Sequence, residues 1–175
     1  MTDILLISED YIKTNSGLND NVWGSYLTPA IREAEDMRLQ SIIGTSLYKT
    51  ILNQVDNDEV SVEIETLIED YIQIFLMYQT ISDLVPIIGV KLTNLGAVVS
   101  NDEHLTNLSQ GERDLVQNYY LERADFYAKR LQEYLLANRE KYPELNDCDC
   151  ENMKANLYSS ASCTLFLGGL RGRRL

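Results

Sequence analysis

Residues 62–102 read VEIETLIEDYIQIFLMYQTISDLVPIIGVKLTNLGAVVSND and decide the fold class. The first part of this stretch repeats apolar residues at helical spacing, which places a continuous apolar stripe along one face of an α-helix. The stripe consists of Ile64, Leu67, Ile68, Tyr71, Ile72, Phe75, Tyr78, Ile81 and Leu84. No charged residue lies between Asp70 and Asp83. We therefore predict a helix covered on nearly all sides by other helices or by another subunit.

A membrane span would also require an uncharged run. The run covers only residues 71–82, whereas a helix needs ~20 apolar residues to cross a bilayer. We therefore interpret it as a buried helix. The N-terminal sequence MTDILLIS has a short apolar run and an acid at position three, which does not fit a signal peptide. We expect a protein that is soluble and intracellular when it is made.

The chain leaves this helix at Pro86, because proline has no N–H to donate and restricts the preceding residue. The segment that follows, IIGVKLTNLGAVVSND, places Gly89, Asn94 and Gly96 between short apolar runs. This pattern is typical of an extended excursion or a small hairpin. An apolar, non-helical insertion must pack against something, so we expect the segment to be a contact surface.

Shorter helices are predicted before the central one. Ser8 is a suitable N-cap for a first helix. Thr28 and Pro29 are expected to be the N-cap and the first residue of a second helix, which ends at Gly44. A third helix follows at once over residues 45–55. Together these elements supply the partners that the central helix needs.

A long helix is predicted after residue 108. Ser109 and Glu112 match a capping box, and the helix they open should run to about Lys141, a length of about 45 Å. Its inward side chains are expected to be Val116, Tyr120, Tyr127, Leu131, Tyr134 and Leu135. We predict a mainly α fold: an antiparallel helical bundle over residues 1–142, with the short extended or hairpin excursion, and an extended C-terminal arm over residues 143–175.

Charge separates the bundle from the arm. The chain has 15 Lys and Arg against 27 Asp and Glu, a net charge of −12, and the whole excess falls on residues 1–142. Such a body is repelled by phosphates, so we expect DNA as a passenger and not as a ligand. The arm instead combines a strand-like apolar run with a basic tip, which predicts that it completes another surface. These residues are Leu165, Phe166, Leu167, Arg171, Arg173 and Arg174.

No motif predicts catalysis or a metal site. His104, the one histidine, lies in a polar loop. Cys148 and Cys150 alternate with acids, but the stretch lacks the glycine of a calcium loop and enough ligands for zinc. Two acidic clusters are expected to be solvated helix faces, namely Glu33, Glu35 and Asp36, and Glu63, Glu65, Glu69 and Asp70. We expect no enzymatic activity and no cofactor.

The order of several segments resembles the phage head-to-tail connector (adaptor) proteins, and most closely the portal-proximal ring proteins of crAss-like tailed phages. The segments are IIGTSLYKTIL, DLVP, KLTNLGAVVSND, ADFYAKRLQEYLLANREKYPE and NLYSSASCTLFLGGLRGRR. The resemblance covers nearly the whole chain. It implies a structural virion protein and not an enzyme. Such a protein would be one subunit of a ring of twelve below the portal, joining capsid to tail and continuing the DNA exit channel.

The resemblance also implies contacts. Lys91, Asn94 and Gly96 belong to the loop region that would meet neighbouring ring components, and residues 165–174 would reach an adjacent subunit or the portal. Leu95 stands where the pattern commonly has a basic residue, which weakens any contact of this loop with phosphate. The implied partners are other copies of the chain, the portal protein and other ring or tail proteins. The implied location is the head-tail junction of the virion, after synthesis in the host cytoplasm, with no membrane partner.

A second interpretation remains open. The protein could be an acidic helical modulator that binds and inhibits a host protein by imitating the charge of DNA. This interpretation predicts a monomer with acidic stripes, and it gives the apolar arm no role.

Overall fold

The computed structural model describes residues 4–18, 22, 24–88, 90–93, 96–99, 109–146 and 153–157. The predicted mainly α fold is confirmed. The α-helices are α1 (Glu9–Asn15), α2 (Gly24–Glu33), α3 (Gln40–Ile43), α4 (Thr45–Asp56), α5 (Val62–Leu67), α6 (Gln73–Leu84) and α7 (Gln110–Ala137). Two π-helical segments, η1 (Ala34–Leu39) and η2 (Ile68–Ile72), and two 3-10 turns, η3 (Arg139–Lys141) and η4 (Pro143–Asn146), complete the helical elements.

The π-helical segments sit inside two longer helices. The residues flanking η1 and η2 keep helical dihedral angles, so residues 24–43 and 62–84 each form one continuous helix. In η1 the N–H of Gln40 donates to the carbonyl of Glu35, five residues back instead of four. Such a wide turn rotates the residues that follow it, and this changes which side chains face the core.

The helix predicted to begin at Pro29 begins earlier, at Gly24, so Pro29 lies inside it. Proline at this position removes the N–H that would bond to the carbonyl of Ser25, and its ring crowds that carbonyl. Because Ser25 is exposed, water can satisfy that carbonyl. The predicted end at Gly44 is correct: Gly44 has φ +81° and its N–H donates to the carbonyl of Gln40.

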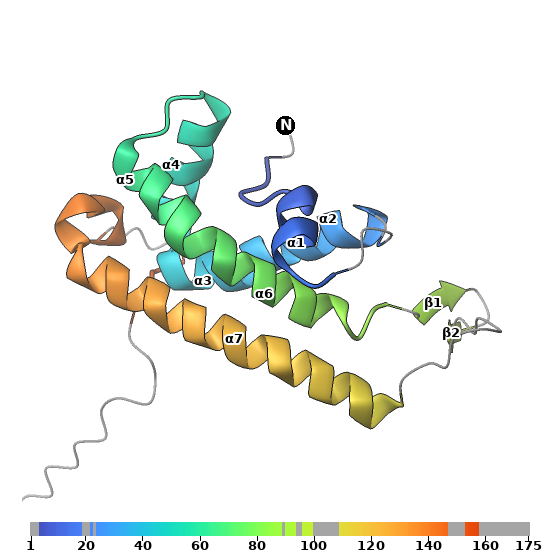
Figure 1. Cartoon of the computed structure of the whole chain (residues 1–175). Coiled ribbons are helices and arrows are strands. Elements are labelled where there is room, and N and C mark those ends of the chain that lie inside the picture. The colour runs from blue at the N-terminus through green and yellow to red at the C-terminus, as the bar shows by residue number, and fades with distance from the viewer. Residues whose placement is uncertain are drawn as a thin grey trace, which may run out of the picture.

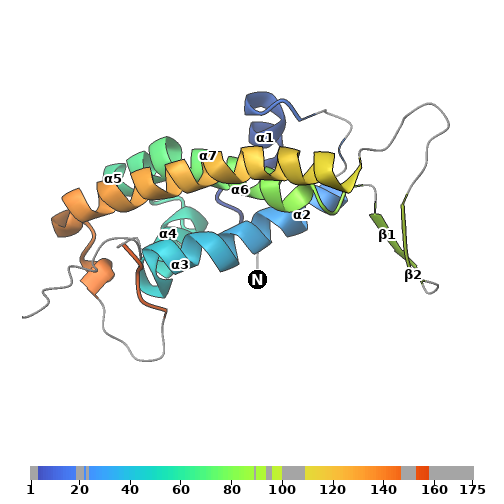
Figure 2. The ribbon, with the colours of Figure 1, turned by 90° about the horizontal axis from the view of Figure 1, so that it is seen from below.

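An antiparallel pair of helices, α6 and α7, forms the centre of the molecule (Figures 1 and 2). Tyr71 stacks on Tyr134 with ring centroids 4.1 Å apart, and Tyr78 stacks on Tyr127 at 5.4 Å. Every residue of the predicted central stripe is buried or half-buried, and α2 covers another side of α6. The shorter helices pack on this pair, while the bundle arrangement as a whole stays a prediction. No helix within the described ranges has the length and apolarity to cross a membrane.

The predicted capping box of α7 is present. The side-chain oxygen of Ser109 accepts from the N–H of Glu112, and the Glu112 carboxylate accepts from the N–H of Ser109 at 2.8 Å. The α-helix ends at Ala137, before the predicted end near Lys141, and Arg139–Lys141 form the 3-10 turn η3 instead. Val116, expected to face inward, is instead 37% exposed.

The excursion after α6 is a two-stranded antiparallel hairpin, β1 (Val90–Thr93) and β2 (Gly96–Val99). Its register pairs Val90 with Val99 and Thr93 with Gly96. The hairpin projects beyond the helices at the end where α6 stops and α7 starts (Figures 1 and 2).

The first part of the predicted C-terminal arm packs on the helical body. Leu145 and Leu157 are both buried in the core cluster. The carbonyl of Met153 accepts from the N–H of Thr45 at 2.9 Å, and the N–H of Asn156 donates to the carbonyl of Ile42 at 3.0 Å. The two leucines and these bonds anchor residues 143–146 and 153–157, so a separate arm does not begin at residue 143. Residues 158–175 lie outside the described part of the chain.

Candidate interaction surface

The residues predicted to make contacts fall at the hairpin and beyond the described C-terminal residues. Lys91 lies in β1, paired with Val98, and Gly96 is the first residue of β2. Asn94, between the strands, lies outside the described residues. The same holds for the predicted apolar run and basic tip, namely Leu165, Phe166, Leu167, Arg171, Arg173 and Arg174. Of the two predicted contact regions, the structure therefore describes the backbone of one, the strands of the hairpin that carry Lys91 and Gly96.

A further surface, not predicted from the sequence, lies on the outer side of α7. Leu115, Tyr119 and Phe126 are 70%, 50% and 62% exposed. They are four and seven residues apart, so they lie on one side of the helix. We call these three residues the α7 face. The opposite side of α7, with Ala124, Leu131 and Leu135, is fully buried, so this helix has an apolar side toward the core and another toward solvent.

A cation orders part of the α7 face. The guanidinium of Arg123 lies 3.3 Å from the centre of the Tyr119 ring, and its Nη1 donates to the Tyr119 carbonyl at 2.8 Å. Cation–π contacts of this kind contribute about 0.5–1 kcal/mol at exposed sites. The Tyr119 ring is thus held in place before any partner arrives. An ordered aromatic side chain loses little entropy on binding.

Beyond this face, toward the C-terminal end of α7, a seam of tyrosines fixes the helix against its neighbours. Tyr142 is fully buried, and its hydroxyl donates to the carbonyl of Glu63 at 2.9 Å. The hydroxyls of Tyr134 and Tyr142 are 3.2 Å apart and share a hydrogen bond. The seam therefore ties the C-terminal end of α7 to α5. The α7 face is consequently carried by a helix that is packed along its length.

One buried acid lies away from the surface. Glu35 was expected to be solvated, but it is 1% exposed, because it follows the buried Ile31 by four residues and so lies on the same, core-facing side of the helix. Its carboxylate accepts from the N–H of Leu6 at 2.8 Å and from the hydroxyl of Tyr48 at 3.3 Å. Burial raises the pKa of Glu35 to about 7, although both hydrogen bonds oppose this shift.

The Glu35 carboxyl joins three parts of the chain. Leu6 belongs to the N-terminal segment, and its carbonyl also accepts from Nε2 of Gln73 at 3.4 Å. Burial raises the pKa of Tyr48, which keeps its hydroxyl a hydrogen-bond donor. A perturbed carboxyl can mark a catalytic site, but this one is enclosed by protein groups and has no open path to a substrate. It acts as a clamp that holds the N-terminal segment against η1 and α4.

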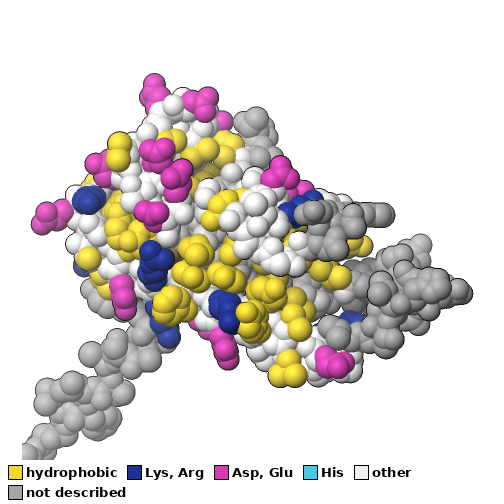
Figure 3. Space-filling model, in the orientation of Figure 1, with side chains coloured by type: hydrophobic (Ala, Val, Ile, Leu, Met, Phe, Trp, Pro, Cys, Tyr) yellow, Lys and Arg dark blue, Asp and Glu magenta, His cyan; other side chains and the backbone are white. Residues whose placement is uncertain are grey.

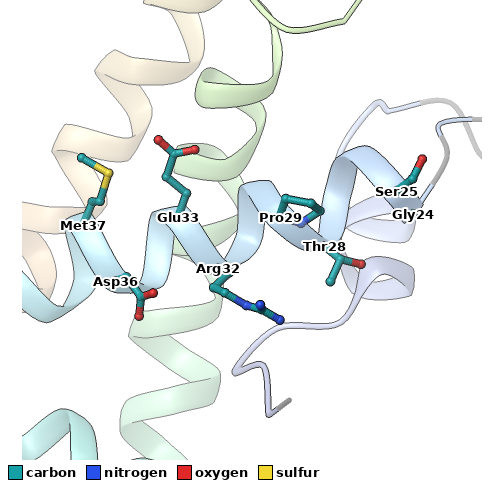
Figure 4. A pocket seen from close by; sticks show the side chains of 8 residues that line it. All are labelled: Gly24, Ser25, Thr28, Pro29, Arg32, Glu33, Asp36 and Met37. Carbon is teal, nitrogen blue, oxygen red and sulfur yellow. The ribbon is translucent and has the colours of Figure 1, made fainter. Parts of the chain in front are cut away.

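A shallow groove of about 600 Å³ runs along α2 and η1. Among the described residues, its lining consists of Gly24, Ser25, Thr28, Pro29, Arg32, Glu33, Asp36 and Met37. Figure 4 shows Glu33 and Met37 pointing to one side of the helix and Arg32 to the other, so the side chains do not converge on one point. Convergent polar groups are what a small-molecule site needs, and the groove does not supply them.

Within the described ranges, no three His, Cys, Asp or Glu side chains lie close enough to hold a metal ion. Cys148, Cys150, Cys163 and His104 fall outside these ranges. The α7 face is therefore the feature of the described structure best suited to binding. Sequence spacing could have revealed it, since its three residues follow helical periodicity, but the charged residues between them suggested a solvated side.

Comparison with known proteins gave one match. Residues 39–154 match a family described as "Family of unknown function (DUF6712)", and this range includes both α5 and α7. No curated protein and no solved structure matches the chain. Because the matched range is more than half of the 175 residues, the chain belongs to the family of unknown function DUF6712.

Proposed function

We propose that this protein is a structural virion protein, one subunit of a ring below the portal of a tailed phage. In this role it joins the capsid to the tail and continues the channel through which DNA leaves. The partners would be other copies of the chain, together with the portal protein and further ring or tail proteins. The proposal assigns no catalytic activity to the protein.

The observation that carries the proposal is the α7 face. Leu115, Tyr119 and Phe126 remain exposed although the chain has its own buried core. Exposed apolar groups of this size on one helix side favour a protein partner. A ring subunit needs such a surface wherever it meets a neighbour. The likeness of several sequence segments to portal-proximal ring proteins supports the same role.

The charge of the chain agrees with a channel component. At a net charge of −12, the protein as a whole repels DNA phosphates. A channel wall that does not hold DNA lets it pass, so DNA would be a passenger. Because the acidic chain repels DNA, its binding partners should be proteins. Contacts with these proteins should involve apolar groups and local charge pairs.

Native mass spectrometry of the protein, alone and mixed with the portal protein of the same genome, tests the proposal. We expect a closed ring or a stoichiometric complex with the portal. Purified virions should contain the protein at a fixed ratio to portal subunits. A monomer under both conditions, together with absence from virions, would contradict the proposal and favour an acidic modulator of a host protein.

A further inference from the structure

A second exposed apolar site lies near the C-terminal end of α7, away from the α7 face. Val62, the first residue of α5, is 72% exposed, and Val60 just before it is 38% exposed. We call these two residues the α5 tip. The hydrogen bond from Tyr142 to Glu63 places α5 beside the C-terminal end of α7. Leu115 and Tyr119 of the α7 face belong to the N-terminal half of that helix, and Phe126 lies just past its middle. The N-terminal end of α7 is the end far from α5 in both views (Figures 1 and 2).

The distance between the two sites follows from the length of α7. Phe126, the residue of the α7 face nearest to α5, lies eleven residues before the end of α7 at Ala137, about 17 Å at 1.5 Å per residue. The α5 tip and the α7 face are therefore too far apart to touch within one copy. Each is exposed because nothing in the described part of its own chain covers it.

The surroundings of the two sites differ in charge. The chain has no lysine or arginine between Lys49 and Lys91, while seven acids lie between residues 56 and 70. Figure 3 shows acidic side chains grouped around α4 and α5. The α7 helix carries Arg113, Arg123, Lys129 and Arg130 among five acids. Lys141 lies beside Ser61 and Glu63 at this end, so the α5 end is mainly acidic. It would thus attract cations of α7, with apolar groups available on both sides.

We propose that the α7 face of one copy docks on the α5 tip of a second copy, so that copies associate head to tail. This inference rests on the proposed function, since it names the contact by which ring subunits would meet. The two contacting surfaces are different, so each copy can use both at once. A head-to-tail contact of this kind gives a ring when the rotation between copies closes, and an open filament when it does not.

Two substitutions test this contact. Phe126→Asp places a charge on the α7 face and leaves the α5 tip intact, whereas Val62→Asp does the reverse. Both side chains are exposed, so both variants should fold, which far-ultraviolet circular dichroism and thermal unfolding would verify. Met37→Asp is the matched control, because Met37 is 61% exposed and belongs to neither surface. We expect each test variant to weaken association at least about tenfold, and the control to behave as wild type.

Mixing the two variants gives the decisive result. Phe126→Asp alone and Val62→Asp alone should each be monomeric in native mass spectrometry. Their mixture retains one intact contact, between the α7 face of Val62→Asp and the α5 tip of Phe126→Asp. We therefore expect a one-to-one dimer and no larger species.

Other outcomes would overturn the inference. Wild-type assemblies that persist in either single variant would show that copies meet elsewhere. Association lost in Phe126→Asp but retained in Val62→Asp would indicate that two α7 faces contact each other. Wild type that stays monomeric in isolation would also overturn the head-to-tail contact. In that last case a complex with the portal would leave the proposed ring function standing, and its absence would contradict both.

Discussion

At the scale of single residues, the environment of Glu35 differs most from the sequence-based expectation. Its neighbours Glu33 and Asp36 are exposed, as expected for a solvated acidic cluster, whereas Glu35 is buried. Glu35 follows the buried Ile31 by four residues, so helical spacing places it on the side of the helix that the core covers. A buried carboxyl with two donors is tolerated, but burial disfavours its charged form.

The raised pKa of Glu35 predicts how stability depends on pH. The carboxyl keeps its proton up to a pKa of about 7 in the folded chain, against 4.5 ordinarily. Between these values the unfolded chain has released its proton and the folded chain has not, so the free energy of unfolding should fall as pH rises. The difference amounts to about 3 kcal/mol. Chemical denaturation from pH 4 to 8 measures it.

Glu35→Gln should remove this pH dependence. Glutamine is neutral at every pH, can accept from the N–H of Leu6 and can donate to the oxygen of Tyr48. Glu33→Gln, an exposed neighbour, is the matched control and should keep the slope of the wild type. A slope unchanged in Glu35→Gln would show that another group causes it.

Thr80 leads to a second prediction at this scale. It is fully buried in α6, and its Oγ1 has no hydrogen-bond partner in the described structure. Valine has nearly the same shape without the hydroxyl, so Thr80→Val should raise the free energy of unfolding by about 1 kcal/mol. Thr66→Val is the control, because the Thr66 hydroxyl donates to the carbonyl of Val62 at 2.8 Å. Equal effects at the two positions would contradict the explanation.

At the scale of elements, the sequence predicted where the helices lie better than which side of each helix is buried. The capping box fixed the start of α7, and the apolar stripe identified the long helix that contains α5, η2 and α6. The residues predicted to face inward on α7 are buried or half-buried except for Val116, while the buried Ala124 was not predicted. The outer apolar residues were missed, because a helix with apolar residues on two sides has no single clear stripe.

The end of α3 shows how one glycine joins two elements. Gly44 has φ +81°, and a Cβ at this position would lie 2.8 Å from the backbone nitrogen of Ala155. Gly44→Ala should therefore strain the backbone, at a cost of about 1–3 kcal/mol, and displace residues 153–157. Thermal unfolding would show a lower melting temperature.

Gly111→Ala is the matched control for this prediction. Gly111 lies in the first turn of α7, and an added Cβ would meet nothing within 4 Å. Because alanine favours helix over glycine, stability should stay the same or rise slightly. A melting temperature lowered equally by both substitutions would contradict the role given to Gly44.

At the scale of the whole molecule, charge and apolar surface are unevenly distributed. The α5 tip, with acids around it, and the α7 face lie apart on a body held together by the α6 and α7 pair. If copies meet through these ends, salt should weaken their association by screening the charges. It should not abolish association, because the apolar contact remains.

Sedimentation velocity at low and high sodium chloride tests this prediction. We expect the dissociation constant between copies to rise with salt in the wild type. Arg130→Gln removes one cation of α7 and should reduce the salt dependence, whereas Lys49→Gln, an exposed cation on α4, should leave it unchanged. Association that strengthens with salt would indicate a contact dominated by apolar groups.

The sequence by itself determined the helical class, the buried central helix, the caps at Ser8, Gly44 and Ser109, and the excursion after Pro86. These features depend on local periodicity and on the chemistry of single residues, which neighbouring positions encode. Only the tertiary structure decided the burial of Glu35, the packing of Leu157 on the body and the exposure of the α7 face. Each of these depends on which distant segments meet and on which helix sides they cover, which local spacing does not reveal.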